Sequence, residues 1–462
     1  YKTDRSGLEM QARLQKVGLF SRRTPTPIRL AFGLALMIVV SSLLLMLPGV
    51  AVERPLRLNE ALFTATSALT VTGLSIIVPG KDLTVFGQLL LLALIQVGGI
   101  GYMVISVLIF RLIGRSISFA DRLALRDSFG LLDLKAIITL TWRVLIAVFA
   151  LEAVGTFLLW LNWRSMLGGE RAFLFALFHA VSAFCNAGFD LFAGTPGFSG
   201  IPNDNFSLLV MGSLIFVGGL GIPVVADILY LFIRQRHRLS LHSRLTLIIT
   251  VFLILFGALG LFLAETRPGA TLSSAPTVRA LVISTFQSVS ARTAGFSAID
   301  NFYELSPASQ LLKISLMFIG TAPASMGGGI TTGTFVVLLL ALWAFARGRE
   351  TPHVFGRSLG AATIRRASAV LTISLLVVIS ATWILLITHP GASLDRVLFE
   401  VISAFATCGL SLNYTSNLSL FGQALIGFIM FWGRLGALTI ILALAQLTPP
   451  RLIAYPEEQI LI

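Results

Sequence analysis

Four short segments that end in glycine recur along this chain: Thr70-Val71-Thr72-Gly73, Cys185-Asn186-Ala187-Gly188, Arg292-Thr293-Ala294-Gly295 and Ala406-Thr407-Cys408-Gly409. Their glycines follow one another at intervals of 115, 107 and 114 residues, so four copies nearly fill the 462-residue chain. Self-similarity at a fixed period indicates a fold built from repeated units. We therefore expect four related units, each contributing one of these glycine-ended segments.

The composition of the chain places these units in a membrane. Hydrophobic residues make up 56% of the chain and charged residues 12%, and the mean hydropathy is +0.90, which is too apolar for a soluble globule. Each long apolar run can cross a hydrocarbon core of about 30 Å. The predicted spans are Ile28–Val50, Val85–Ile113, Ile137–Leu161, Phe206–Ile233, Leu245–Ala264, Ala367–Thr388, Leu418–Leu447 and an interrupted run, Leu311–Phe345.

The formal net charge of +13 is distributed as a topology signal. Lysine and arginine concentrate in residues 1–29, 111–135, 234–244 and 347–366, which fall on one side of an eight-span topology. This positive-inside bias predicts a multi-pass protein with both termini in the cytoplasm, and it argues against nucleic acid as a partner. The same basic loops suit contact with anionic membrane lipids.

Each glycine-ended segment is preceded by the same pair of residues. Phe63 and Ser67 lie ten and six residues before Gly73, and the pair returns as Phe178 and Ser182, Phe286 and Ser290, and Phe399 and Ser403. A spacing of four places the two side chains on one face of a helix. These stretches are too short to span a membrane, so we expect re-entrant helices over Leu58–Leu69, Ala172–Phe184, Val278–Ala291 and Leu394–Phe405.

The predicted fold class is an all-α polytopic membrane protein. Four covalently linked repeats, each a span, a pore helix, a filter segment and a second span, are expected to surround one central pore. The repeats cover residues 28–115, 116–238, 239–349 and 350–448, between a basic cytosolic segment, 1–27, and a cytosolic tail, 449–462. Within the second spans, the glycine pairs Gly98-Gly99 and Gly218-Gly219 are explained most simply by close helix packing.

The four glycine-ended segments suit a filter for cations. Non-helical backbone persists at membrane depth only where protein or a water-filled cavity surrounds it. Four such segments around one axis form a ring of backbone carbonyls that replaces the water shell of an alkali cation, and glycine provides the φ and ψ values this requires. The candidate ion ligands are the backbone carbonyls of Thr70, Val71, Thr72, Gly73, Cys185, Asn186, Ala187, Gly188, Arg292, Thr293, Ala294, Gly295, Ala406, Thr407, Cys408 and Gly409.

Two further residue classes bear on this pore. A disulfide between Cys185 and Cys408 would cross it, whereas two small packing residues fit the pattern without that conflict. Ten acidic residues near the outer ends of the elements are solvated loop charges one by one, but together they would give the mouth a negative potential. They are Glu53, Glu60, Asp82, Asp190, Asp204, Glu265, Asp300, Glu304, Asp395 and Glu400.

The second span of the third repeat departs from the pattern. As one helix, Leu311–Phe345 would be far longer than a hydrocarbon core of about 30 Å, and its middle, Gly320–Thr334, holds five glycines and a proline. We call Gly320–Thr334 the glycine-rich loop and expect it to lie within the membrane below the filter as a gate, the alternative being a passive helix break. Its candidate gate residues are Gly320, Thr321, Ser325, Gly327, Gly328, Gly329, Thr331 and Thr332.

Arg434 is the other departure, since it occupies the position of Gly99 and Gly219 near the middle of the last predicted span. A buried arginine at a helix centre costs at least ~2.5 kcal/mol and is a functional-site hypothesis by default. Pointing inward, it would place positive charge in the cation path and hold carbonyls or hydroxyls of the glycine-rich loop. The alternative is a structural arginine that pairs with a helix C-terminus.

These residues resemble the Trk/Ktr/HKT superfamily of potassium transporters from about Ile28 to Thr448, and most closely the membrane subunits of bacterial Ktr systems. The most specific matches are Ser290-Ala291-Arg292-Thr293-Ala294-Gly295-Phe296, Phe184-Cys185-Asn186-Ala187-Gly188-Phe189, Thr70-Val71-Thr72-Gly73-Leu74 and Gly433-Arg434-Leu435-Gly436. The resemblance implies a homodimer in the bacterial cytoplasmic membrane, with one potassium path in each subunit. It also implies control by a cytosolic nucleotide-binding ring of the KtrA type, and it makes the loop and Arg434 gate elements.

The resemblance also bears on the ion. In this family a serine at the first filter position accompanies sodium permeation, whereas Gly73, Gly188, Gly295 and Gly409 are all glycine, which favours potassium as the transported ion. Sodium remains a candidate activator, and no covalent cofactor is expected. A sodium-permeable member of the same superfamily is one alternative.

Two other function classes compete with a gated potassium pore. An alternating-access cation symporter also uses broken helices with sites at the membrane midplane, but it usually moves two related halves rather than four quarters of one orientation. An enzyme is not expected, because the five histidines have no metal-ligand spacing and no nucleophilic or paired-carboxylate arrangement is present. The histidines are His179, His237, His242, His353 and His389.

Overall fold

The computed structural model describes residues 26–101, 136–233, 239–323, 325–349 and 351–436. Several predictions lie wholly or partly outside these residues. They are the cytosolic segment 1–27 except its last two residues, the tail 449–462, the basic loop 111–135, and the C-terminal parts of the predicted spans Val85–Ile113 and Leu418–Leu447.

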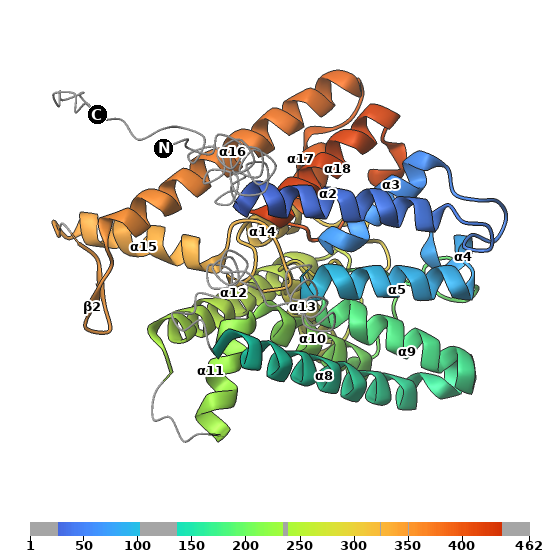
Figure 1. The fold of residues 1–462 in the computed structure, drawn as a ribbon, viewed down its shortest axis with the longest axis horizontal. Coiled ribbons are helices and arrows are strands. Elements are labelled where there is room, and N and C mark those ends of the chain that lie inside the picture. Colours follow the sequence, from blue (N-terminus) through green and yellow to red (C-terminus); the bar gives the residue numbers. More distant parts are fainter. Residues whose placement is uncertain (1–25, 102–135, 234–238, 324, 350, 437–462) are drawn as a thin grey trace, which may run out of the picture.

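The described residues form helices, with one short hairpin between α15 and α16 (Figure 1). The hairpin pairs β1 (His353–Val354) with β2 (Arg357–Ser358) in antiparallel register. The α-helices are α2 (Thr26–Leu45), α3 (Leu58–Thr70), α4 (Pro79–Asp82), α5 (Val85–Ile100), α8 (Ala136–Leu167), α9 (Gly169–Phe184), α10 (Asn205–Gly219), α11 (Ile222–Ile233), α12 (Leu241–Glu265), α13 (Thr277–Ser290), α14 (Pro307–Phe318), α15 (Thr332–Ala346), α16 (Ala361–Thr388), α17 (Leu394–Phe405) and α18 (Leu420–Leu435). Two 3-10 turns are η1 (Phe302–Glu304) and η2 (Thr415–Asn417).

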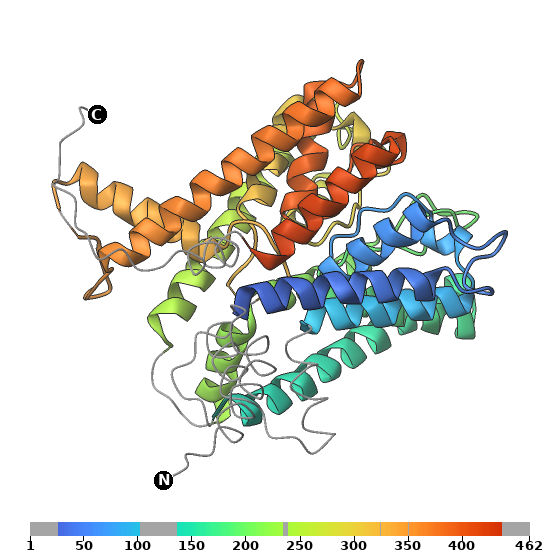
Figure 2. The same cartoon turned by 45° about the horizontal axis from the view of Figure 1, so that its top comes forward.

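These helices fall into four sets in chain order, which we call units 1 to 4: α2 to α5, α8 to α11, α12 to α15, and α16 to α18. In each unit a first helix packs on a short buried helix, as α2 on α3, α8 on α9, α12 on α13 and α16 on α17. The helix that follows then contacts the short helix of the next unit, as α5 with α9, α10 with α13, α14 with α17 and α18 with α3. The last pair closes a cycle of contacts (Figures 1 and 2).

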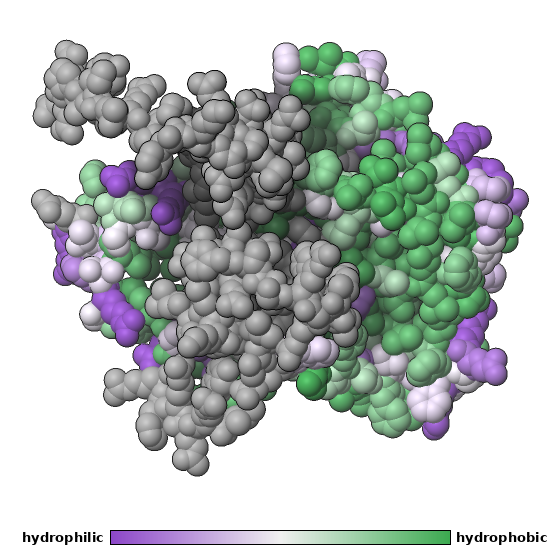
Figure 3. Space-filling view, in the orientation of Figure 1, coloured by the Kyte–Doolittle hydropathy of each residue, from purple (hydrophilic) through white to green (hydrophobic). Residues whose placement is uncertain are grey.

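The surface of the described residues is strongly apolar. Figure 3 shows a broad hydrophobic face over α2, α5 and α8, with hydrophilic residues at its right-hand edge. Within the described residues, α8, α12 and α16 contain stretches long and apolar enough to cross a membrane, and the bent pair α10 and α11 would make a fourth. Four shorter apolar helices, α2, α5, α15 and α18, accompany them.

The predicted span Phe206–Ile233 is not one straight helix, because the chain turns sharply within it. The helical parts Asn205–Gly219 and Pro223–Leu229 are inclined by 103°. Gly221 has a φ of +81° between them, a left-handed conformation that glycine adopts without strain, and Pro223 lies in the first turn of the next helix. An apolar run alone does not reveal such a turn, since its residues are hydrophobic on both sides of the bend.

The helices that follow the glycine-ended segments begin in the same way. Each of α5, α10, α14 and α18 has an N-cap side chain, Thr84, Asp204, Ser306 or Ser419, that accepts a hydrogen bond from the backbone N–H three residues later. Gln88, Gln310 and Gln423 each donate to the carbonyl oxygen five residues earlier, at Leu83, Leu305 and Leu418. The recurrence of these side-chain contacts ties the sequence period to the start of each second helix.

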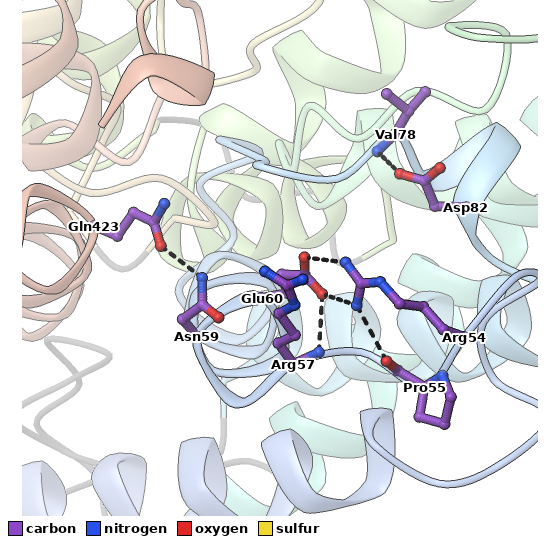
Figure 4. A network of polar contacts seen from close by, with 8 residues as sticks. All are labelled: Arg54, Pro55, Arg57, Asn59, Glu60, Val78, Asp82 and Gln423. Atoms are coloured by element: carbon purple, nitrogen blue, oxygen red, sulfur yellow. Dashed lines mark hydrogen bonds and ion pairs between the residues drawn. The ribbon is translucent and has the colours of Figure 1, made fainter. Parts of the chain in front are cut away.

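One polar contact joins the first unit to the last. Asn59 at the start of α3 donates through Nδ2 to Oε1 of Gln423 on α18, at 3.0 Å (Figure 4). On the same turn Glu60 accepts from Arg54 and from the backbone N–H of Arg57, and Arg54 holds the pKa of the Glu60 carboxyl below its usual value. The negative charge of Glu60 is therefore balanced by an ion pair with Arg54.

Candidate functional site

The four glycine-ended segments have one backbone conformation. In each, the residue two places before the glycine has a positive φ: Val71 (57°), Asn186 (57°), Thr293 (71°) and Thr407 (50°). The glycines Gly73, Gly188, Gly295 and Gly409 have φ values of 88°, 69°, 77° and 93°. When residues in the left-handed region alternate with residues of negative φ, successive N–H groups point to one side of the chain. The carbonyl groups then point to the other side.

The repeated serines of the short helices bind these N–H groups. The N–H of the residue before each glycine donates to the serine carbonyl: Thr72 to Ser67 at 2.8 Å, Ala187 to Ser182 at 2.7 Å, Ala294 to Ser290 at 2.9 Å and Cys408 to Ser403 at 2.8 Å. In units 1 and 4 the serine hydroxyl also accepts from the glycine N–H at 3.0 Å. In units 2 and 3 it donates to the carbonyl oxygens of Phe189 and Phe296. The N–H groups named here are thus bound to the short helix of their own unit.

The glycines lie next to one another in a closed ring. A Cβ added to Gly73 would overlap the carbonyl oxygen of Ala187, and one on Gly188 would lie 2.8 Å from that of Ala294. A Cβ on Gly295 would overlap the carbonyl oxygen of Cys408, and one on Gly409 that of Thr72. Each glycine therefore approaches the residue before the next glycine, and the fourth returns to the first. Segments up to 336 residues apart meet here, with no room for side chains at the glycines.

The other side chains of the segments turn away into the protein. Cys185 and Cys408 are free and buried, as expected of packing residues. Arg292 is almost completely buried and donates to the carbonyl oxygens of Thr250 at 3.3 Å and Gly320 at 3.0 Å. Thr407 accepts through Oγ1 from the N–H of Gly328 at 2.8 Å. The side chains of units 3 and 4 thus contact the glycine-rich loop.

The glycine-rich loop packs directly against these segments. Helix α14 ends at Phe318 and α15 begins at Thr332, with a single parallel bridge, Ile319 to Ile330, across the gap. The N–H groups of Ala322 and Met326 donate to the carbonyl oxygens of Gly219 and Gly218, at 3.2 Å and 3.4 Å. A Cβ on Gly327 would overlap the hydroxyls of Thr293 and Thr321. The loop is therefore bound to units 2, 3 and 4 at once.

Arg434 binds the same loop from unit 4. Its guanidinium donates through Nη1 to the carbonyl oxygen of Met326 and through Nη2 to that of Gly98. Carbonyls or hydroxyls of the loop are the predicted partners of Arg434, and the carbonyl of Met326 is the one observed. The hydroxyls bond to one another instead, Thr321 with Ser325 at 2.7 Å and Thr331 with Thr334 at 3.2 Å, while Thr332 is completely buried.

The sequence pattern of the TrkH family, described as a cation transport protein, matches residues 33–453. The chain belongs to the TrkH family of cation transport proteins. It is 35% identical to the Ktr system potassium uptake protein B of Bacillus subtilis, over 98% of this chain and 99% of that protein. It is also 35% identical to the protein of the same name from Vibrio alginolyticus, over 91% of each chain, and 34% identical to the potassium/sodium uptake protein NtpJ of Enterococcus hirae, over 96% of this chain and 98% of that one.

A solved structure has the same fold. The potassium transporter TrkH from Vibrio parahaemolyticus superposes with a TM-score of 0.71 at 18% identity, over 91% of this chain and 85% of that one. The all-helical, multi-pass membrane architecture of the TrkH family is thereby confirmed for this chain. As a member of this family it is a membrane transporter of cations and not an enzyme.

The sequence alone does not single out some of the buried charged residues that lie near the glycine-ended segments. Glu152 on α8 is buried and accepts from the amide of Gln96 on α5, at 2.9 Å and 3.1 Å, beside the Cys185 thiol. Lys313 on α14 is completely buried and donates to Oε1 of Gln287 on α13 at 2.7 Å. A charged residue within an apolar run is the one signal that could have marked Glu152 and Lys313 beforehand.

The prediction of a negatively charged mouth is wrong for two of its ten residues. Glu265 and Glu400 are completely buried. Glu265 accepts from the hydroxyls of Thr271 and Ser306, both at 2.7 Å, and so ties the end of α12 to the start of α14. Both carboxylates serve internal contacts, and any outer potential rests on the remaining eight.

Proposed function

We propose that this chain carries potassium ions into the cell through the ring formed by its four glycine-ended segments, arranged as four repeats around one central pore. The observation that carries the proposal is the closed ring of glycines. The N–H of the residue before each glycine is bound to the short helix, and the carbonyl oxygen of that residue lies against the glycine of a neighbouring segment. A neutral ring of carbonyls attracts a dehydrated cation without trapping it. The short helices α3, α9, α13 and α17 then act as pore helices.

The ring favours potassium, because all four positions that face one another are glycine. A serine at one of them would add a Cβ where Ala187, Ala294, Cys408 or Thr72 already places a carbonyl oxygen. Transport inward follows the membrane potential, which is worth about 2.3 kcal/mol per elementary charge and 100 mV. Relatives named for potassium and for potassium/sodium uptake support this ion class, with sodium as activator or second substrate.

We further propose that the glycine-rich loop and Arg434 form the gate. The loop touches Thr293 and Thr407 of two segments, and Arg434 ties it to Gly98 across the ring. With the loop in this position a cation leaving the ring meets packed backbone and a guanidinium. Opening requires that the loop release its bonds to Gly218, Gly219 and Arg434.

Regulation and assembly follow the Ktr relatives. We propose a homodimer in the bacterial cytoplasmic membrane, with both termini cytoplasmic and a cytosolic nucleotide-binding ring of the KtrA type as partner. The relatives named as Ktr system proteins B support the partner, and the basic loops of the sequence support the orientation. The continuous cycle of unit contacts favours this pore over an alternating-access symporter, since no boundary divides the described residues into two halves.

Uptake measurements in a host that lacks its own potassium-uptake systems test the proposal. Cells expressing the chain with a KtrA-type partner should accumulate potassium from micromolar external concentrations and grow there, whereas cells with an empty vector should not. Sodium uptake, measured in parallel, separates a potassium pore from a sodium-permeable one. Growth and uptake equal to the empty vector, with the protein present in the membrane, would refute the proposal.

A further inference from the structure

A polar pair recurs behind the ring, and it lies at the same two positions in every unit. The first position follows the repeated phenylalanine on the short helix and holds Thr64, His179, Gln287 or Glu400. The second lies two residues after the glycine and holds Ser75, Asp190, Ser297 or Ser411. All four residues at the first position are completely buried, so each polar side chain there needs a partner.

In three units the two positions bond to each other. His179 Nε2 lies 2.9 Å from Asp190 Oδ1, Gln287 Nε2 donates to Ser297 Oγ at 3.1 Å, and Ser411 Oγ donates to Glu400 Oε2 at 2.7 Å. The chemistry of the pair differs each time, but the placement is the same. In unit 1 the Thr64 hydroxyl has no hydrogen-bond partner among the described residues, and Ser75 bonds to the backbone of Ile77 instead.

The second position also closes the turn that follows the ring. Its side chain accepts a backbone N–H two or three residues later: from Ile77 to Ser75 at 3.3 Å, from Phe192 to Asp190 at 2.7 Å, from Ile299 to Ser297 at 3.2 Å and from Tyr414 to Ser411 at 3.2 Å. In units 2 to 4 each pair therefore connects the short helix, the end of the glycine-ended segment and the turn beyond it. We call these three pairs the braces.

Two braces have additional buried contacts. Thr415 Oγ1 donates to the second carboxylate oxygen of Glu400, so both oxygens are held by hydroxyls. In unit 3 the buried ammonium of Lys313 binds Gln287 Oε1, which turns the amide nitrogen of Gln287 toward Ser297. The ring of Phe302 lies 4.8 Å from that ammonium. Such enclosed networks are rigid when every member is satisfied.

We propose that the braces fix the spacing of the ring carbonyls, and that Glu400 is the positioning residue on which potassium affinity and discrimination against sodium depend most. The inference rests on the proposed potassium pathway. Carbonyl ligands select between ions only while the backbone behind them holds their geometry, and supporting hydrogen bonds provide that rigidity. Glu400 never touches the ion; it acts through Ser411 and Thr415 on the backbone beyond Gly409.

The test compares Glu400→Gln, Glu400→Ala and Ser411→Ala in potassium and sodium uptake. Glutamine already forms this brace in unit 3, so Glu400→Gln should keep the wild-type KM and ion preference. Glu400→Ala should raise the KM for potassium about tenfold, with sodium uptake gained, because the hydroxyls of Ser411 and Thr415 lose their buried partner. Ser411→Ala removes one donor and should raise the KM less, and it replaces Glu400→Ala if that variant does not reach the membrane.

Thr64→Val is the matched control, since it changes the same position in the unit where no brace forms. It should leave the KM and the ion preference unchanged. Equal damage from Glu400→Gln and Glu400→Ala would show that charge matters and not the brace, and wild-type behaviour of Ser411→Ala and Glu400→Ala would show that neither matters. Either result overturns the inference, whereas a wild-type chain that carries no potassium refutes the proposed function instead.

Discussion

The ring of glycine-ended segments and the layer beneath it are built on opposite principles. The ring uses the same backbone conformation four times, with a glycine at each of the four closest contacts between neighbouring segments. The layer beneath uses residues that occur once: the glycine-rich loop of unit 3 and Arg434 of unit 4. A ligand shell for an ion can be symmetric, but a device that opens and closes needs a part that differs from its equivalents.

The same contrast between repeated and unique parts is seen in the glycines near the ends of α5, α10, α14 and α18. A Cβ on Gly98, Gly218 or Gly433 would overlap a carbonyl oxygen at the end of the short helix of its own unit, so these glycines permit close packing. At the equivalent position in unit 3, a Cβ on Gly320 would instead overlap the carbonyl oxygen of Gly328 in the loop. In unit 3 the glycine therefore makes room for the glycine-rich loop, whereas in the other units it makes room for the short helix.

The largest effect is expected from breaking the ring. Gly73→Ser and Gly409→Ser place a Cβ on a neighbouring carbonyl oxygen at φ values of 88° and 93°, which costs about 1–3 kcal/mol in backbone strain alone. Potassium preference over sodium in uptake should fall at least about tenfold. Gly427→Ala on α18 is the control, because nothing lies within 4 Å of its added Cβ. Unchanged preference in both serine variants would contradict the ring as filter.

A smaller effect of opposite sign is expected from displacing the loop. Gly327→Ala adds a Cβ that overlaps the hydroxyls of Thr293 and Thr321, so the loop loses its packed position. Potassium flux without the KtrA-type partner should rise several-fold, because the displaced loop loses hydrogen bonds that hold it below the ring. Gly360→Ala, which has open space around it, serves as control. Reduced flux with normal ion preference would show that the loop supports the path and does not close it.

Arg434→Ala should act in the same direction as the loop variant, with a smaller effect. The loop loses one charge-assisted bond at Met326, worth about 1.5–3 kcal/mol, while its bonds to Gly218 and Gly219 remain. Partner-independent uptake should appear, and Arg434→Lys should restore only part of the control because lysine cannot bridge two carbonyls as a planar fork does. Wild-type dependence on the partner in Arg434→Ala would remove this residue from the gate.

The smallest effect is expected far from both layers. Arg54→Gln removes the exposed partner of Glu60 and leaves the Arg57 N–H bond in place (Figure 4). Uptake should change by less than about twofold, because exposed ion pairs contribute little and are screened by salt. A large loss at physiological salt would show that the outer turn of α3 contributes to the ion path.

The sequence predicted the parts of this fold that repeat by residue type. The re-entrant helices expected over Leu58–Leu69 and Leu394–Phe405 correspond to α3 and α17 almost residue for residue, since phenylalanine, serine and glycine recur at fixed spacing. The braces could not be predicted from the sequence, because threonine, histidine, glutamine and glutamate stand at the same position of the repeat but differ in chemistry. The bend between α10 and α11 could not be predicted either, because hydropathy does not show in which direction a helix runs.

Contacts between units could not be read from the sequence at all. That Arg434 reaches Gly98, and that Arg292 turns away from the ring toward Gly320, depends on how the four units close. The period of the glycine-ended segments indicates that a ring exists, but only the structure shows which unit follows which around it.

The most direct measurement of the central claim is an anomalous diffraction map of crystals grown with thallium, a heavy substitute for potassium. The account predicts a peak on the axis of the ring, among the carbonyl oxygens of Thr72, Ala187, Ala294 and Cys408, and the loss of that peak in Gly409→Ser. An empty ring, with thallium bound instead among side-chain carboxylates, would contradict it.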